Sequence, residues 1–327
     1  MNVLLIGPVA EPKAFNGIQT VNRLLASILD EEHNLDVAIP VNQLFTGKIR
    51  TRKVKDLTGA GTFGVDWSKP LSFAPYDMLA LSGSDVPYKR IIRAFPGDIL
   101  IWVHGVHLSP LHQLSGKEKS RQNIRIVCCD AVSLDHAKAM GWEDRAFLLE
   151  NPVPFETDEV VAGEGYGIIV SSLSKRKNFP AMIEAAKRCA PGVPVRVYGQ
   201  VKDESILQLI GESGQLQYCG TLEHKELMQV LSKASFMIHM ACVEGYPSVA
   251  VREANGLGVP VILPKNPLYE ASASDQNIFV DVNDLQPVDI TAAAALKNRK
   301  KLAKQTREKY GLEAFRKALF SIVDGAG

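Results

Sequence analysis

The segment EGYPSVAVREANGLGVPVIL spans Glu244 to Leu263 and places two carboxylates, Glu244 and Glu253, in a stretch that otherwise has the composition of a loop, a short helix and a buried strand. If a helix runs over about 248–257, Glu253 shares its face with aliphatic residues one turn before and one turn after it. Burying an unpaired charge costs several kcal/mol at least. The segment therefore predicts that a protein cation or the hydroxyl groups of a bound ligand pair with Glu253.

Around this segment, short aliphatic runs alternate with amphipathic segments. In the first half NVLLIG precedes GIQTVNRLLASIL, and DILIWVHG and RIVCC follow. This alternation is the signature of parallel strands with crossover helices, so we predict a doubly wound α/β domain over 1–151. A stretch rich in proline, glycine and acid then predicts a linker. The alternation restarts at GIIVSSL and predicts a second such domain over 152–306, with a closing helix over 307–327 that packs back on the first.

Composition bounds the class of protein. The chain has 327 residues, of which 46% are hydrophobic and 22% charged, enough for two cores of about 150 residues each. A net charge of +1 creates no global field that demands nucleic acid as a partner. No apolar run approaches the roughly 18 residues of a membrane-spanning helix, and the N-terminus enters a strand pattern rather than a signal peptide. We therefore expect a cytoplasmic protein.

Two doubly wound domains that face each other bind ligands in the crevice between the carboxyl ends of their strands. The long loop GPVAEPKAFNG ends in Asn16 and Gly17 at a helix start, where backbone amides and the helix dipole favour an anion, although Gly17 suits a plain turn equally well. The loop lacks GxGxxG, which excludes the nicotinamide-cofactor fingerprint. His104 follows a buried strand at the same edge, where a lone histidine is more often structural.

A run of cations opens the second domain. Lys175, Arg176 and Lys177 lie between a predicted strand and the next helix, in SSLSKRKNF. Charge runs are usually solvated surface. Three cations at a helix N-terminus are nevertheless unfavourable with the helix dipole, and an anionic ligand would relieve that. The sequence contains no DxD carboxylate pair to hold a divalent metal.

The quoted segment resembles the signature of the large class of retaining GT-B glycosyltransferases, group 1. That signature has two glutamates around a helix entry, the second of them opening the pattern E-A-x-x-x-G-x-P-V. Weaker landmarks follow in the same order along nearly the whole chain, from the Asn-Gly loop through His104 to Lys177. The residues that match the signature are Glu244, Gly245, Tyr246 and Pro247 in its first half and Glu253, Ala254, Gly258, Pro260 and Val261 in its second.

The resemblance implies a GT-B fold of two Rossmann-like domains and a transferase that moves a hexosyl group from a nucleotide sugar, with a UDP-sugar favoured, to an acceptor. It also implies that the enzyme retains the anomeric configuration of the sugar and needs no metal and no cofactor. Glu253 would accept hydrogen bonds from the ribose hydroxyls, Glu244 would hold the sugar, and Lys177 would neutralise the departing diphosphate. His104 would bond the sugar or stabilise charge. The other donor-binding residues that it implies are Asn16, Gly17, Ser172, Lys175, Arg176, Gly245, Tyr246, Pro247, Ser248 and Val249.

Two departures from the class stand out. Eight residues separate Glu244 from Glu253, where members usually have seven. The extra residue is absorbed either in the loop before the helix, which keeps both carboxylates in place, or inside the helix, which misaligns them. Ser172 stands where members usually carry an arginine on the strand end, so Lys175 or Arg176 would have to supply that charge.

Other functions stay open at this point. A GT-B-shaped sugar-nucleotide epimerase, a non-catalytic nucleotide-sugar binder and a phage-type enzyme that glycosylates DNA bases would use a similar crevice. The acceptors that we expect are a lipid-linked molecule, an envelope glycan or nucleic acid. The segment FTGKIRTRKVKDL predicts weak contact with the inner membrane face, and a solvated loop explains it equally well. Its cations are Lys48, Arg50, Arg52, Lys53 and Lys55.

Overall fold

The computed structural model describes residues 1–8, 17–38, 73–74, 76–83, 86–105, 109–157, 159–241 and 248–325. The chain divides into two compact units. Met1–Glu150 and Phe315–Gly327 form the first, and Asn151–Ala314 form the second. Each unit has a six-stranded sheet, and every strand pair in both sheets is parallel. The predicted doubly wound α/β architecture is confirmed in both halves.

The first sheet has the strand order β2-β1-β3-β4-β5-β6. Its strands are nearly continuous aliphatic runs, because helices cover both faces of a parallel sheet and leave little of it in water. All five residues of β3, for example, are buried. The strands are β1 (Asn2–Ile6), β2 (Asn34–Ala38), β3 (Met78–Ser82), β4 (Asp98–Val103), β5 (Ile124–Cys128) and β6 (Ala146–Leu148).

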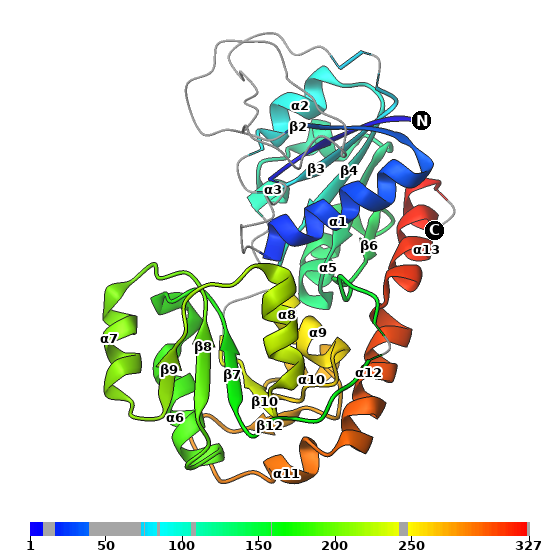
Figure 1. The fold of residues 1–327 in the computed structure, drawn as a ribbon. Helices are drawn as coiled ribbons and strands as arrows, with labels where there is room; N and C mark the ends of the chain where they lie inside the picture. Colours follow the sequence, from blue (N-terminus) through cyan, green and yellow to red (C-terminus); the bar gives the residue numbers. More distant parts are fainter. Residues whose placement is uncertain are drawn as a thin grey trace. The chain divides into compact units, whose positions relative to one another are not determined.

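Helices pack on both faces of this sheet. Helix α1 crosses in front of it in Figure 1 and buries an aliphatic stripe that includes Leu25 and Leu29. On α13, Phe315 packs on Trp102 of β4 with ring centroids 6.0 Å apart. Side chains from α2 and α5 join the core on the other face. The helices are α1 (Gly17–Glu32), α2 (Tyr88–Ala94), α3 (Ser109–His112), α4 (Gly116–Lys119), α5 (Ala131–Ala137), the π-helix η2 (Lys138–Trp142) and α13 (Leu312–Val323).

The second sheet has the order β12-β11-β10-β7-β8-β9. Counted from β7, this is the Rossmann order 3-2-1-4-5-6, in which the direction of winding reverses between the first and fourth strands. Here those strands are β7 and β10, which pair through Phe236 and Met237. The strands are β7 (Gly167–Val170), β8 (Val195–Tyr198), β9 (Leu216–Tyr218), β10 (Phe236–Ile238), β11 (Val261–Pro264) and β12 (Ile278–Val280).

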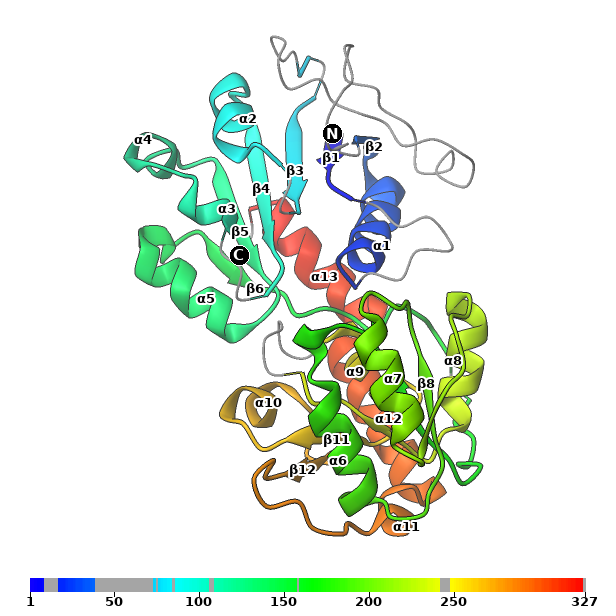
Figure 2. The same cartoon turned by 90° about the vertical axis from the view of Figure 1, so that its left-hand side faces the viewer.

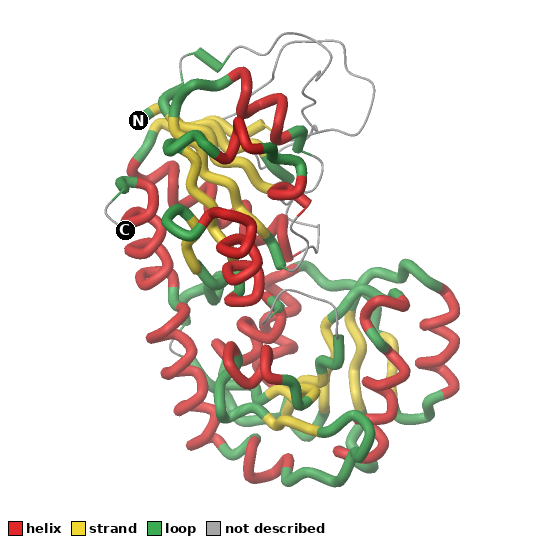
Figure 3. Tube along the Cα trace, turned by 180° about the vertical axis from the view of Figure 1, so that it is seen from behind, coloured by secondary structure: helices red, strands yellow, loops and turns green. Residues whose placement is uncertain are grey.

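Two groups of helices cover the second sheet. Helices α6 and α7 share one face and lie side by side in Figure 2. Side chains of α8, α9 and α10 pack on the other. In Figure 3 the strands of each unit form one layer with helices on either side. The helices are the 3-10 helix η3 (Lys175–Lys177), α6 (Phe179–Cys189), α7 (Glu204–Glu212), α8 (His224–Lys233), α9 (Val249–Gly256), α10 (Pro267–Ser272), α11 (Ile290–Ala293) and α12 (Leu296–Tyr310).

The unit boundaries differ from the predicted ones. The first break falls between Glu150 and Asn151, and the chain returns to the first unit at Phe315 rather than at 307. Helix α12 is continuous through 307 and ends at Tyr310, whose ring lies 3.2 Å from the Arg252 guanidinium and whose carbonyl accepts from the Val153 amide at 2.8 Å. These contacts keep 307–314 in the second unit.

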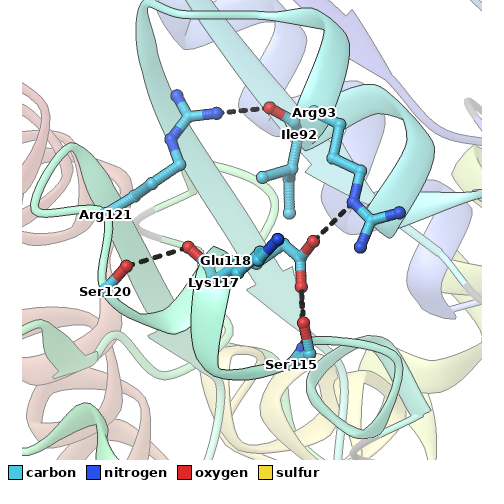
Figure 4. Close-up of polar contacts among 7 residues, drawn as sticks. All are labelled: Ile92, Arg93, Ser115, Lys117, Glu118, Ser120 and Arg121. Atoms are coloured by element: carbon cyan, nitrogen blue, oxygen red, sulfur yellow. Dashed lines mark hydrogen bonds and ion pairs between the residues drawn. The ribbon is translucent and has the colours of Figure 1, made fainter.

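A buried carboxylate joins α2 to α4 in the first unit. Glu118 is 2% exposed, and its carboxylate accepts hydrogen bonds from Arg93 Nε at 2.7 Å and from the Ser115 amide at 2.9 Å. Figure 4 shows the Arg93 contact and a further bond from the Ser115 hydroxyl. The Ser115 hydrogen bond, with the Arg93 contact, lowers the pKa of Glu118 to about 2. The ionised carboxylate therefore stabilises this corner of the fold.

We expect Glu118→Gln to lower the free energy of unfolding at pH 7 by about 2 kcal/mol, the range for hydrogen bonds to a charged group. The folded-state pKa lies below the ordinary value of about 4.3, so this stabilisation is present above that value and is lost as the pH falls toward 2. Urea unfolding at pH 7 and pH 3 measures both effects. The exposed Glu143→Gln is the control, and equal stability of the two variants at pH 7 would contradict the assignment.

Candidate functional site

The second unit places several predicted residues where its winding reverses. Ligands of doubly wound sheets bind outside the carboxyl ends of the strands at this point. Ser171 and Ser172 follow β7 there, and His239 to Ala241 follow β10. Ser172, the predicted arginine position, is half-buried. The candidate site of this unit is therefore formed by the chain just beyond these two strands.

The connection from β7 to α6 carries the predicted cations on η3. Lys175 is exposed and lies 3.9 Å from the Asp203 carboxylate, and Arg176 is exposed as well. Asn178 ends η3 in the left-handed conformation, with φ 57°, and its side-chain amide donates to the Met240 carbonyl at 3.3 Å. Asn178 thus ties the cation-bearing turn to the end of β10, a role that the sequence analysis missed.

Gly199 fixes the backbone beside Ser172. It follows β8 with φ 152°, and a Cβ at this position would lie 1.9 Å from the Ser171 carbonyl oxygen. Only glycine allows both this backbone conformation and this approach. The end of β8 therefore packs directly against the chain that leads into Ser172.

Helix α9 matches the helix predicted over about 248–257. It runs from Val249 to Gly256, with Ser248 as its N-cap residue and regular hydrogen bonds from Arg252 to Ser248 and from Leu257 to Glu253. These bonds keep the regular spacing of an α-helix, so α9 has no bulge that absorbs an extra residue. The predicted residues Glu244, Gly245, Tyr246 and Pro247 lie outside the described part of the chain.

The N-terminus of α9 carries groups that can hydrogen-bond a ligand. The Ser248 hydroxyl caps no helix amide, and its buried oxygen has no hydrogen-bond partner among the described residues. Such a hydroxyl and the first amides of a helix suit an oxygen-rich or anionic ligand.

Glu253 lies on α9 with 7% of its side chain exposed, and its partner is His224. The Nε2 atom of His224 lies 2.6 Å from Oε1 of Glu253. Because a carboxylate only accepts, the Nε2 proton is donated to it. Within the described ranges, no other hydrogen bond to the Glu253 carboxylate is present, so Oε2 keeps its accepting capacity.

His224 was not a predicted site residue. It is the first residue of α8, and α8 and α9 pack on the same face of the sheet. The available signal was a histidine at the start of an amphipathic helix, which does not reveal a contact 29 residues along the chain.

In the first unit, His104 follows β4 and Gly17 is the first residue of α1. His104 Nε2 lies 2.8 Å from the Ser82 hydroxyl at the end of β3, and burial lowers the pKa of His104 to about 3. The ring is therefore neutral at physiological pH and cannot supply a positive charge. Of the two predicted roles, stabilising charge and hydrogen bonding to the sugar, only the second remains. Asn16 lies outside the described residues.

The described residues contain no group of three or more His, Cys, Asp or Glu side chains arranged to hold a metal ion. Among those same residues, no helix is both long and apolar enough to cross a membrane.

Comparison with solved structures identifies the fold. The galactosyltransferase WaaB of the lipopolysaccharide outer core matches with 14% identity, a TM-score of 0.67 and 100% of each chain covered. Anabaena Alr3699/HepE in complex with UDP matches with 13% identity and a TM-score of 0.70 over 99% of this chain and 100% of that one. HepE with UDP-glucose matches with 11% identity and 0.68 over 99% of both. The two units thus have the GT-B fold.

The family follows from the sequence. Residues 158–311 match the profile described as Glycosyl transferases group 1. The match covers most of the second unit and confirms the resemblance to group 1 glycosyltransferases that its signature carries. A search of curated proteins finds no match.

Gly199→Ala tests the local geometry of the site. We expect it to lower the free energy of unfolding by at least about 2 kcal/mol, because the new Cβ meets the Ser171 carbonyl in a backbone conformation that costs 1–3 kcal/mol for other residues. Gly211→Ala in α7 is the control, since no heavy atom lies within 4 Å of its new Cβ and alanine favours a helix. Calorimetry of both variants decides, and unchanged stability of Gly199→Ala would contradict the close approach.

Proposed function

We propose that the protein transfers a hexosyl group from a nucleotide sugar, with a UDP-sugar favoured, to an acceptor with retention and without a metal or cofactor. The observation that carries this proposal is the Glu253 carboxylate. One oxygen accepts from His224, and the other can accept from a ligand. A ribose diol presents two adjacent donors to such a carboxylate. The family match and the UDP and UDP-glucose in the HepE structures support this choice of ligand.

Helix α9 would hold both ends of the donor. Glu253 lies five residues after Ser248, a distance of about 7.5 Å along a helix axis. With the ribose at Glu253, the phosphate or sugar reaches the Ser248 hydroxyl and the first amides of the helix. Gly245, Tyr246, Pro247 and Val249 would line this end, and Glu244 would hold the sugar hydroxyls.

The cations after β7 would bind the diphosphate. Negative charge grows on this group as the bond to the sugar breaks, so a nearby ammonium stabilises the transition state more than the bound donor. We assign this role to Lys177. Lys175 or Arg176 would replace the arginine that is absent at Ser172.

Retention needs no dedicated general base in this scheme. The departing phosphate oxygen takes the acceptor proton on the same face of the sugar. Asn16 and Gly17 would bring the first loop to the phosphates. Neutral His104 would contribute a hydrogen bond to the sugar rather than a charge.

Three alternative functions have weaker support. An epimerase would need further acid and base side chains at the sugar, and a non-catalytic binder is suggested only by the serine at the arginine position. Glycosylation of DNA bases would require tight binding to a polyanion, which a net charge of +1 does not favour.

The acceptor is proposed by chemistry alone. A lipid-linked molecule or an envelope glycan suits a cytoplasmic enzyme that binds the inner membrane face weakly. The cations behind this expectation, Lys48, Arg50, Arg52, Lys53 and Lys55, lie outside the described residues.

Glu253→Gln should weaken donor binding by roughly 1.5–3 kcal/mol, about ten- to a hundredfold, because the ribose hydroxyls lose a charged acceptor. Calorimetric titration with UDP-glucose and related UDP-sugars measures this. Glu204→Gln is the control, because Glu204 is an exposed carboxylate in the same unit. If Glu253→Gln binds every donor of the wild type with unchanged affinity, the ribose assignment is wrong.

Lys177→Ala should lower the rate of sugar transfer at saturating donor by at least about tenfold and change donor affinity less, because the charge it meets develops in the transition state. Lys175→Ala and Arg176→Ala should differ from each other, since one of them replaces the absent arginine. Steady-state kinetics of the three variants test this. Wild-type rates in all three would place the diphosphate elsewhere.

A further inference from the structure

A chain of three hydrogen bonds lies at the carboxyl edge of the first sheet, where the winding reverses between β1 and β3. It begins at the Pro8 carbonyl, which accepts from Asn22 Nδ2 at 2.8 Å. Asn22 Oδ1 then lies 2.7 Å from the Ser82 hydroxyl. That hydroxyl lies 2.8 Å from His104 Nε2. Asn22 and Ser82 are both fully buried, so water does not compete for these bonds.

The Pro8 carbonyl fixes which group is the donor in each of these three hydrogen bonds. A carbonyl only accepts, so the NH2 group of Asn22 must face Pro8 and its oxygen must face Ser82. The serine hydroxyl has one proton, which it donates to that oxygen. Ser82 Oγ can then only accept from His104, so Nε2 of the histidine carries the proton.

In a neutral imidazole only one nitrogen is protonated. With Nε2 protonated, Nδ1 is a hydrogen-bond acceptor. Burial lowers the pKa of His104 to about 3, so the ring stays neutral over the working pH range and this assignment holds there.

We call the hydrogen-bonded series Pro8–Asn22–Ser82–His104 the relay. The backbone around it permits this close packing. Gly7 follows β1, and a Cβ on it would lie 2.5 Å from the Ser82 carbonyl oxygen and 3.1 Å from Asn22 Nδ2. Any larger residue would push the two relay side chains apart.

We propose that Asn22 and Ser82 are positioning residues that hold His104 with its proton on Nε2, so that Nδ1 accepts a hydrogen bond from a hydroxyl group of the substrate. This proposal rests on the proposed sugar transfer and specifies that His104 accepts, rather than donates, the hydrogen bond to the substrate. His104 would select a donor hydroxyl rather than bind a phosphate or a carbonyl oxygen, because an unprotonated nitrogen repels both.

The tautomer can be measured without any activity. In the full-length protein with isotope-labelled histidine, ring nitrogen chemical shifts distinguish a protonated from an unprotonated position. His104→Gln identifies the signal among the seven histidines of the chain. We expect Nε2 protonated and Nδ1 unprotonated in the wild type. The opposite tautomer, or a charged ring at pH 7, would overturn the proposal.

Asn22→Leu tests the relay. Without the amide, the Ser82 proton is free to turn to Nε2, and we expect the protonated nitrogen of His104 to change to Nδ1 in part or in full. Ser27→Ala, on the exposed side of the same helix, should leave the signal unchanged. A wild-type signal in Asn22→Leu would overturn the relay.

Kinetics separates positioning from mere stability. Asn22→Leu should lower the transfer rate about tenfold, the effect of one hydrogen bond, and should add no further loss in a His104→Gln background. An equal further loss in that background would show a general structural role and would contradict the proposal. If the wild type transfers no sugar, the proposed function fails, whereas the tautomer measurement still decides the relay.

Discussion

A buried carboxylate must be paired, and this constraint organises the second unit. Glu253 is 5% exposed on a helix whose neighbouring residues are core, so removing its partner would leave a charge in a poorly hydrated place. The pairing with His224 requires α8 and α9 to lie on the same face of the sheet, which the Rossmann strand order provides. His224 satisfies one oxygen, and in our proposal the other accepts from the donor. The same interaction thus joins two helices of the fold and holds the carboxylate that we propose binds the donor.

The architecture was predictable because its signals are local. Runs of aliphatic residues and amphipathic periods indicated two parallel α/β units, and the helix considered over about 248–257 lies close to the observed Val249–Gly256. The return of the chain to the first unit was not predictable in position. Helix α12 continues without a break through 307. Its last residue, Tyr310, contacts Arg252 of the second unit and keeps the helix there. No local sequence pattern indicates this contact.

The site was predictable in part, for the same reason. A carboxylate among aliphatic residues indicates that it needs a partner. His224 becomes that partner only through the packing of two helices, which the sequence does not show. The left-handed Asn178 and its bond to Met240 likewise depend on the pairing of β7 with β10. For His104, sequence supplied the position at a strand end. The neutral state of the ring depends on burial, and its orientation depends on Ser82 and Asn22, which are distant in sequence.

The central claim is that the protein transfers a sugar from a donor held by the second unit. Its most direct test is product analysis after incubation with a panel of nucleotide sugars, each with and without lipid-linked, glycan and duplex DNA acceptors. We expect free UDP to appear in step with one glycosylated acceptor whose new linkage keeps the anomeric configuration of the donor. Recovery of the donor as an epimer, or binding of the donor with neither nucleotide release nor sugar transfer to any acceptor, would contradict the account.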